Sequence, residues 1–208
     1  MIRNLIIPGL LETGSVCDGV LAICDGCVNL YVMKSPTGLL CIDAGWAPGR
    51  ILHAFSDLGL DIRDVTAVFV THLHWDHARC IDLYPHAQVF VGEREIRSTR
   101  RNVARTWEKV RADQTVNVAG FAVRVLETPG HTPGSMSFLV DGRFLFTGDT
   151  IQFRHGEAFP FMPWFGSDRA ALDLSIRKLA RIDGLKYIFT AHTGFASDPV
   201  KAFCHWRE

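Results

Sequence analysis

Three histidines and one aspartate stand close together in the segment Thr71–His77, which reads Thr-His-Leu-His-Trp-Asp-His. Imidazole nitrogens and carboxylate oxygens are the ligands that zinc and similar divalent ions take in proteins. The segment is too short to surround one ion with His72, His74, Asp76 and His77 together. It therefore predicts donors that face two adjacent ions, and the alternative is a solvated, histidine-rich loop.

Three further candidate donors occur later in the chain, each beside a strand-like stretch. His131 stands in a loop rich in Gly and Pro, between two such stretches. Asp149 and His192 each come just after an apolar stretch. Loops at strand ends can gather around one site when the strands form a layered scaffold. These three donors make the solvated-loop alternative less favoured.

The elements that must position these donors are short and alternate along the chain. Mixed α and β elements in the order β-rich, α/β, β-rich, α/β favour two similar halves, with sheet stacked on sheet and helices outside. The predicted helices are 48–58, 93–111 and 167–182, the last with Ser167 as N-cap. The predicted strands are 19–33, 38–43, 65–70, 88–91, 115–118, 121–126, 136–140, 143–146 and 187–190.

Composition narrows the class of protein. The chain has 208 residues, of which 48% are hydrophobic, and this suits one packed domain over 1–208. It has 22 basic and 22 acidic side chains, so charge gives no reason to expect a nucleic acid or an anionic membrane as partner. No apolar run reaches the roughly 20 residues that span a bilayer. We expect a cytoplasmic protein with mostly reduced cysteines.

The ordered donor set resembles that of the metallo-β-lactamase-fold hydrolases, whose pattern is HxHxDH followed by a His, an Asp and a final His. The resemblance implies an α+β fold, a four-layer αββα sandwich with the site at one edge of the sheets. It implies two divalent ions, Zn²⁺ first and Fe or Mn as alternatives, with a water or hydroxide between them. By position, it assigns His72, His74 and His131 to the first metal, Asp76, His77 and His192 to the second, and Asp149 to a bridge between the two.

Two metal ions predict hydrolysis, because cations lower the pKa of water and polarise the bond under attack. The expected substrate bond is a carboxylic ester, lactone or thioester, and Asp76 is the candidate for proton transfer. A phosphodiesterase and a mono-iron oxidoreductase of the same fold are the alternatives. Asp43, Thr71 and Thr193 are candidates to orient the metal ligands, although Asp43 could equally be a simple turn residue.

The subclass is less clear from the sequence. The glutathione-thioester hydrolases of this family carry Gly-Cys-Gly-Arg after the bridging Asp, and this chain does not. Lactonases of the family usually have a Tyr there, where this chain has Gln152 and Phe153.

An aromatic segment over 159–165 predicts an apolar lid and hence a small-molecule substrate with an apolar part. A dimer contact, and thus a homodimer, is the alternative role for this segment. The candidate substrate-binding residues are Trp75, Phe153, Phe161 and Trp164.

The stretch 93–111 carries seven basic and three acidic side chains and predicts a surface helix with solvated charges. Cys24 and Cys27 have the spacing of a redox motif. Because they are expected in a strand rather than at a helix N-terminus, a structural role is favoured.

Overall fold

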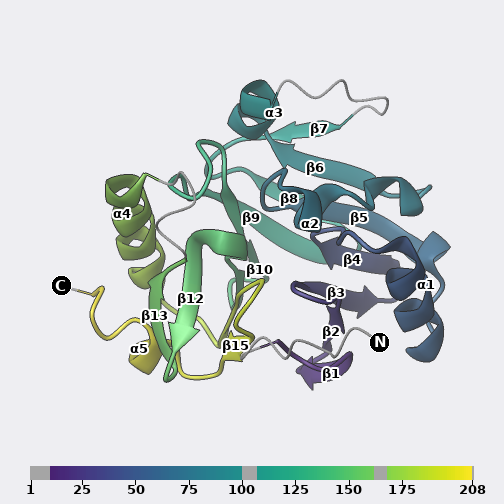
Figure 1. Cartoon of the computed structure of the whole chain (residues 1–208), viewed down its shortest axis with the longest axis horizontal. Helices are drawn as coiled ribbons and strands as arrows, with labels where there is room; N and C mark the ends of the chain where they lie inside the picture. Colours follow the sequence, from purple (N-terminus) through teal and green to yellow (C-terminus); the bar gives the residue numbers. More distant parts are fainter. Residues whose placement is uncertain (1–9, 100–106, 162–167, 208) are drawn as a thin grey trace, which may run out of the picture.

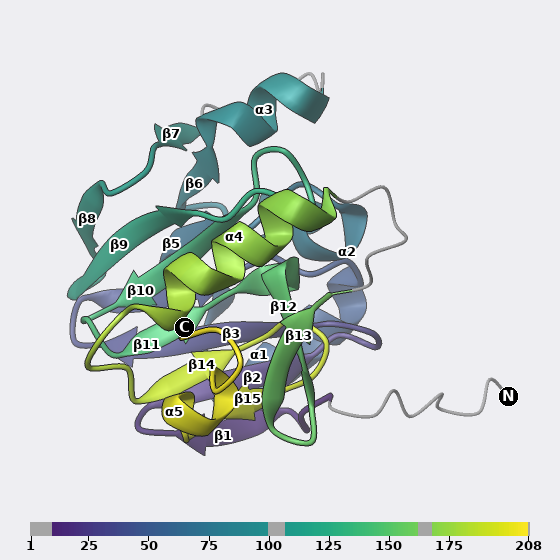
Figure 2. The ribbon, with the colours of Figure 1, turned by 90° about the vertical axis from the view of Figure 1, so that its left-hand side faces the viewer.

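Two β-sheets lie face to face between outer helices in the computed structural model of the chain, which describes residues 10–99, 107–161 and 168–207 (Figure 1). Figure 2 shows α4 (Arg169–Ala180) on the outer face of one sheet, with the other sheet behind. The predicted four-layer αββα sandwich is confirmed. Trp164 and Ser167 lie outside the described residues.

The first sheet contains seven strands in sequence order. Its first four strands pair antiparallel, and the pairings from β4 to β7 are parallel. Its strands are β1 (Gly14–Cys17), β2 (Val20–Cys24), β3 (Asn29–Ser35), β4 (Gly38–Ile42), β5 (Val65–Val70), β6 (Gln88–Gly92) and β7 (Glu108–Val110).

The second sheet contains six strands in the order β15-β14-β11-β10-β9-β8, and only β11 and β14 pair in parallel. A separate hairpin is formed by β12 (Ile151–Arg154) and β13 (Glu157–Pro160). The strands of the second sheet are β8 (Thr115–Val118), β9 (Phe121–Glu127), β10 (Met136–Val140), β11 (Phe144–Phe146), β14 (Tyr187–Phe189) and β15 (Phe195–Ala196).

Helices cover the outer faces and connect the parallel strands. The α-helices besides α4 are α1 (Pro48–Asp57), α2 (Trp75–Ala78), α3 (Glu93–Thr99) and α5 (Pro199–Ala202), and the 3₁₀ turns are η1 (Ile62–Asp64), η2 (Ile81–Leu83) and η3 (Gly148–Thr150). None of the helices in the described ranges is long and apolar enough to cross a membrane.

Alternation along β5 shows how the sequence produces these layers. Successive side chains of a strand point to opposite faces. Val68 and Val70 pack with Phe55 of α1 in the outer core, whereas Ala67 and Phe69 pack between the two sheets. Burying each large side chain contributes about 1.5–3 kcal/mol, so both faces of the strand hold it in place.

Three sequence predictions are wrong in detail. The predicted strand 19–33 is a hairpin of β2 and β3, because its connection includes Gly26 at φ 81°. The prediction of one helix over 93–111 is wrong, because α3 is Glu93–Thr99 and Glu108–Val110 pairs with β6 as a strand. The N-cap of α4 is Asp168 rather than Ser167, because the Asp168 carboxylate accepts a hydrogen bond from Ala171 N.

Candidate metal centre

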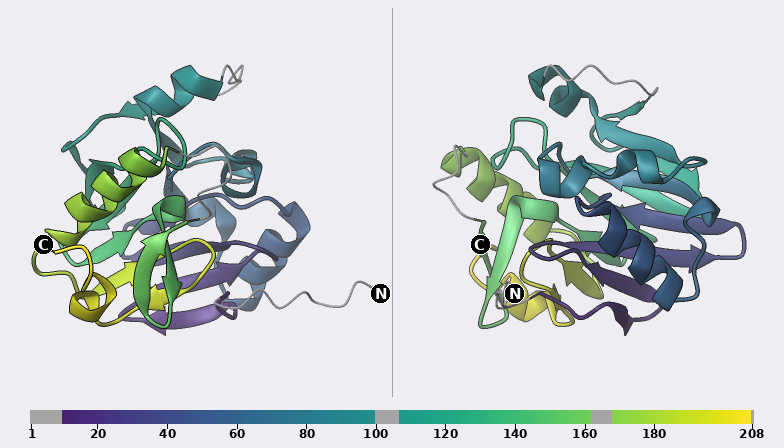
Figure 3. Two further views of the ribbon diagram at one scale, coloured as in Figure 1. Left: turned by 60° about the vertical axis from the view of Figure 1, so that its left-hand side comes forward. Right: turned by 45° about the vertical axis from the view of Figure 1, so that its right-hand side comes forward.

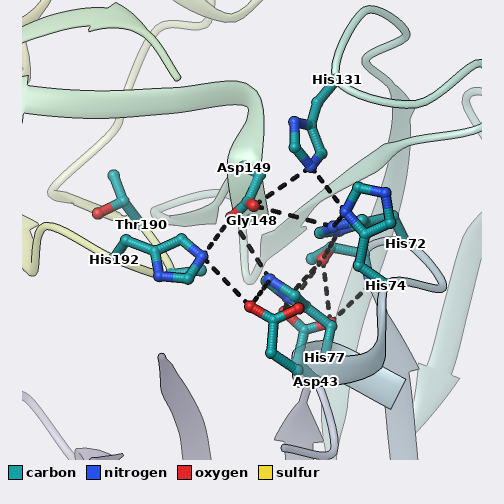
Figure 4. Close-up of polar contacts among 12 residues, drawn as sticks. Asp43, His72, His74, His77, His131, Gly148, Asp149, Thr190 and His192 are labelled. Carbon is teal, nitrogen blue, oxygen red and sulfur yellow. Dashed lines mark hydrogen bonds and ion pairs between the residues drawn. The ribbon is translucent and has the colours of Figure 1, made fainter. Parts of the chain in front are cut away.

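The seven candidate donors all follow strands and meet at one edge of the sandwich. The segment with the first four donors follows β5, and the His131 loop follows β9. Asp149 follows β11, and His192 follows β14, the parallel neighbour of β11. Figure 4 shows Asp149 between His192 on one side and His72 with His74 on the other. The convergence predicted from the sequence is therefore present.

The first group of donors consists of His72, His74, His131 and Asp149. The Nε2 atoms of His72 and His131 each lie 3.0 Å from Nδ1 of His74. Oδ2 of Asp149 lies 3.3 Å from His131 Nε2 and 3.8 Å from His72 Nε2. Four donor atoms thus point at one small volume, as a single cation requires.

The second group consists of Asp76, His77 and His192. Oδ2 of Asp76 lies 3.7 Å from the Nε2 atoms of both histidines. The other oxygen of Asp149, Oδ1, lies 3.2 Å from His192 Nε2 and 3.5 Å from His77 Nε2. Each oxygen of Asp149 therefore faces a different group, which is the position that a carboxylate between two cations would take.

A buried hydrogen-bond network holds two of the histidines from behind. Asp43, which follows β4, accepts hydrogen bonds from the backbone N–H of Thr71 at 2.8 Å and from its hydroxyl at 3.0 Å. His77 Nδ1 lies 2.8 Å from the second oxygen of Asp43, and His72 Nδ1 lies 3.1 Å from the Thr71 hydroxyl. This network places the ring protons on Nδ1 and leaves both Nε2 atoms free for a cation.

His192 is oriented in the same way by a backbone group. Its Nδ1 donates a hydrogen bond of 2.5 Å to the carbonyl of Cys27, so its Nε2 faces Asp76 and Asp149. Thr193 binds elsewhere: its hydroxyl accepts a hydrogen bond from the backbone N–H of Phe153. Asp43 and Thr71 thus contact candidate donors from behind, whereas Thr193 connects β12 to the loop after β14.

The residues present fit divalent cations. His72 and His77 are buried, with exposed fractions of 1% and 0%, which argues against a solvated loop. Within the described part of the chain, His77 Nε2 and Asp149 Oδ1 are buried and have no hydrogen-bond partner. Unpartnered buried polar atoms are costly, and a cation would satisfy both of these acceptors. Metal binding by the seven residues stays a prediction that this geometry supports.

The protonation of the two groups differs. Burial lowers the pKa of His72 well below its ordinary value and the pKa of His131 to about 4. Burial also opposes charge on His77 and His192, but the Asp149 carboxylate, together with Asp43 at His77 and the Cys27 carbonyl at His192, outweighs it and raises the pKa of both rings. Burial alone would raise the pKa of Asp149, yet the facing His192 and His77 rings hold it well below its ordinary value.

This difference predicts that, as the pH is lowered, the second group loses its cation before the first group does. A proton and a cation compete for the same ring nitrogen, so a ring with a raised pKa loses its cation at a higher pH. The first group should hold its cation to a lower pH, because burial lowers the pKa of His72 and of His131. Metal content after dialysis at stepped pH should fall in two stages, and the upper stage should be absent in His192→Asn. A single stage in the wild-type protein would contradict the prediction.

Glu95 of α3 connects the two loops that carry the first group, and the sequence analysis missed it. Its carboxylate accepts hydrogen bonds from Leu73 N at 2.9 Å and from the Thr132 hydroxyl at 2.7 Å. The side chain is buried, although the sequence placed it among solvated charges. The loops pack so closely that a Cβ at Gly134 would lie 2.1 Å from the backbone nitrogen of Glu95.

Glu95→Gln is expected to destabilise the protein by about 1–3 kcal/mol, because the amide puts N–H donors where the carboxylate accepts hydrogen bonds. Metal affinity should fall by about tenfold, since both ligand loops lose a support. Thermal unfolding and metal titration measure the two effects. Glu93→Gln is the control, because the exposed ion pairs of Glu93 with Arg97 and Arg111 are screened by solvent and contribute little to stability. Equal effects of the two substitutions would contradict the role given to Glu95.

The predicted substrate-binding residues occupy different places. The Phe161 ring stacks on His192 at 4.8 Å and meets His131 edge-on at 5.7 Å, so it covers both groups. Trp75 is 51% exposed beside the donors and packs edge-on against Trp46 at 4.8 Å. Phe153 packs against the apolar cluster under α4.

Comparison with known proteins agrees with the fold. The family model described as "Metallo-beta-lactamase superfamily" matches residues 26–192. A probable polyketide biosynthesis zinc-dependent hydrolase of Bacillus velezensis is 30% identical over 57% of this chain and 52% of its own length. An atrochrysone carboxyl ACP thioesterase of Passalora fulva is 32% identical over 59% of this chain and 38% of its own length. The chain thus spans about half the length of the first relative and less of the second.

Solved structures show the same fold. An archaeal metallo-beta-lactamase superfamily protein of Sulfolobus tokodaii aligns with a TM-score of 0.65 at 24% identity, over 92% of this chain and 86% of the other. A subclass B3 metallo-beta-lactamase of Bradyrhizobium japonicum aligns with a TM-score of 0.69 at 19% identity, over 91% and 80%. With the family match over residues 26–192, these likenesses lead to one conclusion: the chain belongs to the metallo-beta-lactamase superfamily.

Proposed function

We propose that the protein is a metal-dependent hydrolase that uses two divalent cations, zinc foremost, to cleave a carboxylic ester, thioester or lactone. The observation that carries this proposal is Asp149, whose two oxygens face two separate groups of histidines. The zinc-dependent hydrolase and the thioesterase among the relatives support the same reaction class.

The cations would supply nucleophilic water near neutral pH and would polarise the bond under attack. The side chains of this chain supply the rest. Neutral His72 and His131 offer free nitrogens, and buried Asp149 balances the positive charge. Asp76 is more exposed than Asp149, with side-chain fractions of 15% and 4%, and is the better placed to exchange a proton with the substrate.

The aromatic surroundings favour a substrate with an apolar part. Phe161 and Trp75 lie beside the donors, so an acyl chain or a ring attached to the scissile bond would contact them. Phe161 also excludes water from the rings of His131 and His192 that it covers. The same apolar contacts would offer little to a small, fully hydrated phosphate ester.

Phe161→Leu is expected to raise KM for long-chain acyl substrates between about twofold and tenfold, because it removes an aromatic contact worth about 0.5–1.5 kcal/mol. Metal content and kcat should change less, since Leu keeps the position apolar. Leu174→Ala, at a 69% exposed position on α4, is the control that should leave KM unchanged. If Phe161→Leu leaves KM for long-chain substrates as unchanged as Leu174→Ala does, the role given to Phe161 is refuted.

The function is tested with the full chain on a panel of acyl thioesters, aryl esters, lactones and bis-p-nitrophenyl phosphate. We expect acyl substrates to be hydrolysed, activity to disappear on chelation, and zinc to restore it. Hydrolysis that survives complete metal removal would contradict the proposal. Turnover of the phosphodiester alone would make the protein a phosphodiesterase, and bound iron with oxygen consumption would make it an oxidoreductase.

A further inference from the structure

A second set of metal-type donors lies on the surface, outside the site described above. It consists of Glu157 at the start of β13 and Cys204 and His205 in the turn after α5. Their ligand atoms lie within 4.8 Å of one another, and Glu157 Oε2 lies 3.0 Å from His205 Nε2. Figure 3 shows the C-terminal turn beside the β12–β13 hairpin.

The chemistry of this set suits a zinc-class ion. A thiolate, an imidazole and a carboxylate are the three ligand types that zinc takes, and three protein ligands leave one position for water. Tetrahedral bonds of about 2.0–2.3 Å place donor atoms roughly 3.3–3.8 Å apart. Small rotations of exposed side chains would bring Glu157, Cys204 and His205 from their present separations to those distances.

The backbone that carries the donors is fixed by contacts of its own. Trp206 donates a hydrogen bond from its indole N–H to the carbonyl of Ala158 at 2.8 Å, which ties the turn to β13. The Arg177 guanidinium of α4 lies over the same indole, 5.7 Å from the ring centroid, and Phe203 is fully buried. The donors are therefore close together before a cation binds, so little binding free energy would be spent on ordering them.

The donors are also open to solvent. Cys204 is exposed, and the side chains of His205 and Glu157 have exposed fractions of 66% and 32%. A metal ion can reach them without any opening of the fold. An exposed thiol beside an imidazole and a carboxylate is not explained by packing in the core.

We propose that Glu157, Cys204 and His205 form a peripheral binding site for a zinc-class transition metal. The bound ion would fasten the C-terminal turn to β13, in addition to the Trp206 hydrogen bond. Because β13 leads directly to Phe161, the ion would brace the hairpin next to the candidate metal centre. The proposal does not depend on the hydrolase activity.

Cobalt distinguishes this site from the candidate metal centre, because a thiolate ligand gives Co²⁺ an intense charge-transfer band and the seven central donors include no cysteine. The full chain is titrated with Co²⁺ while the near-ultraviolet spectrum is recorded. The variants are Cys204→Ser, His205→Gln and Glu157→Gln, with Cys24→Ser and Cys27→Ser as cysteine controls. Thermal unfolding confirms that each variant is folded.

The expected result is a thiolate band that Cys204→Ser abolishes, that His205→Gln and Glu157→Gln weaken, and that both cysteine controls retain. Zn²⁺ should bleach the band and should protect Cys204 from alkylation. The proposal is overturned if no band forms, or if Cys27→Ser removes it and Cys204→Ser does not. A band unaffected by His205→Gln and Glu157→Gln would show an adventitious thiol ligand and would also overturn it.

Discussion

Asp149→Asn is expected to lower hydrolytic activity by on the order of a thousandfold. The amide has a single oxygen, so it could bind the cation of only one of the two donor groups. In the structure, Oδ2 faces His72 and His131, and Oδ1 faces His77 and His192. An amide nitrogen turned toward either group would repel a cation. The substitution also removes the negative charge that balances a cationic centre within a buried site.

The measurement is kcat/KM on the best acyl substrate, together with metal content per chain. We expect Asp149→Asn to retain the fold but to bind less metal, with the loss largest at one group. Asp173→Asn is the matched control, because Asp173 pairs with Arg169 on the exposed side of α4. Near-normal activity with a full complement of metal in Asp149→Asn would show that this carboxylate does not serve both groups.

The sequence predicts the donor set and the layered fold for a physical reason. Ligands that follow strands carry a local signature: an apolar stretch comes first, and then His or Asp at a fixed offset. His131, Asp149 and His192 each show it, and the structure brings all three to the segment that begins at His72. The two sheets follow from the same stretches, since inner strands such as β11 are apolar and buried on both faces.

Glu95 and Asp25 could not be predicted from the sequence, because their roles depend on contacts between distant segments. Glu95 stands in a highly charged stretch, where a solvated acid is the natural interpretation, yet it accepts hydrogen bonds from Leu73 and Thr132. Asp25 stands in a hairpin connection, yet its buried carboxylate accepts hydrogen bonds from the backbone of Trp46 and Ala47 at the start of α1. In both cases the hydrogen-bond donors lie more than twenty positions away in the sequence.

Asp43 lies between these two cases. The sequence allowed a ligand-supporting acid or a simple turn residue, and the backbone shows features of both. Its φ of 63° is a conformation that Asp and Asn tolerate better than most residues. Its buried carboxylate accepts from Thr71 and lies 2.8 Å from His77 Nδ1. Substitution by Asn, which has the same shape but no charge, therefore distinguishes the two roles.

Asp43→Asn is therefore expected to keep the backbone conformation and to weaken metal binding by about 10–100-fold, the range for loss of a carboxylate behind a ligating histidine. The effect should concentrate on the second group, since His77 loses its negative partner and its ring becomes a poorer donor. Metal titration and kcat at saturating and limiting zinc measure it. Added zinc should rescue much of the activity, which it should not do in Asp149→Asn.

The control for backbone strain is Asp141→Asn, because Asp141 also has a positive φ, of 50°, but lies in the β10–β11 turn. If Asp43 serves only as a turn residue, the two substitutions should behave alike and leave zinc affinity unchanged. If Asp43 acts through His77, only Asp43→Asn should need more zinc, and the increase should be smallest at low pH, because loss of the carboxylate lowers the pKa of His77 and protons then compete less for that ring. The dependence of zinc affinity on pH thus decides between the two roles.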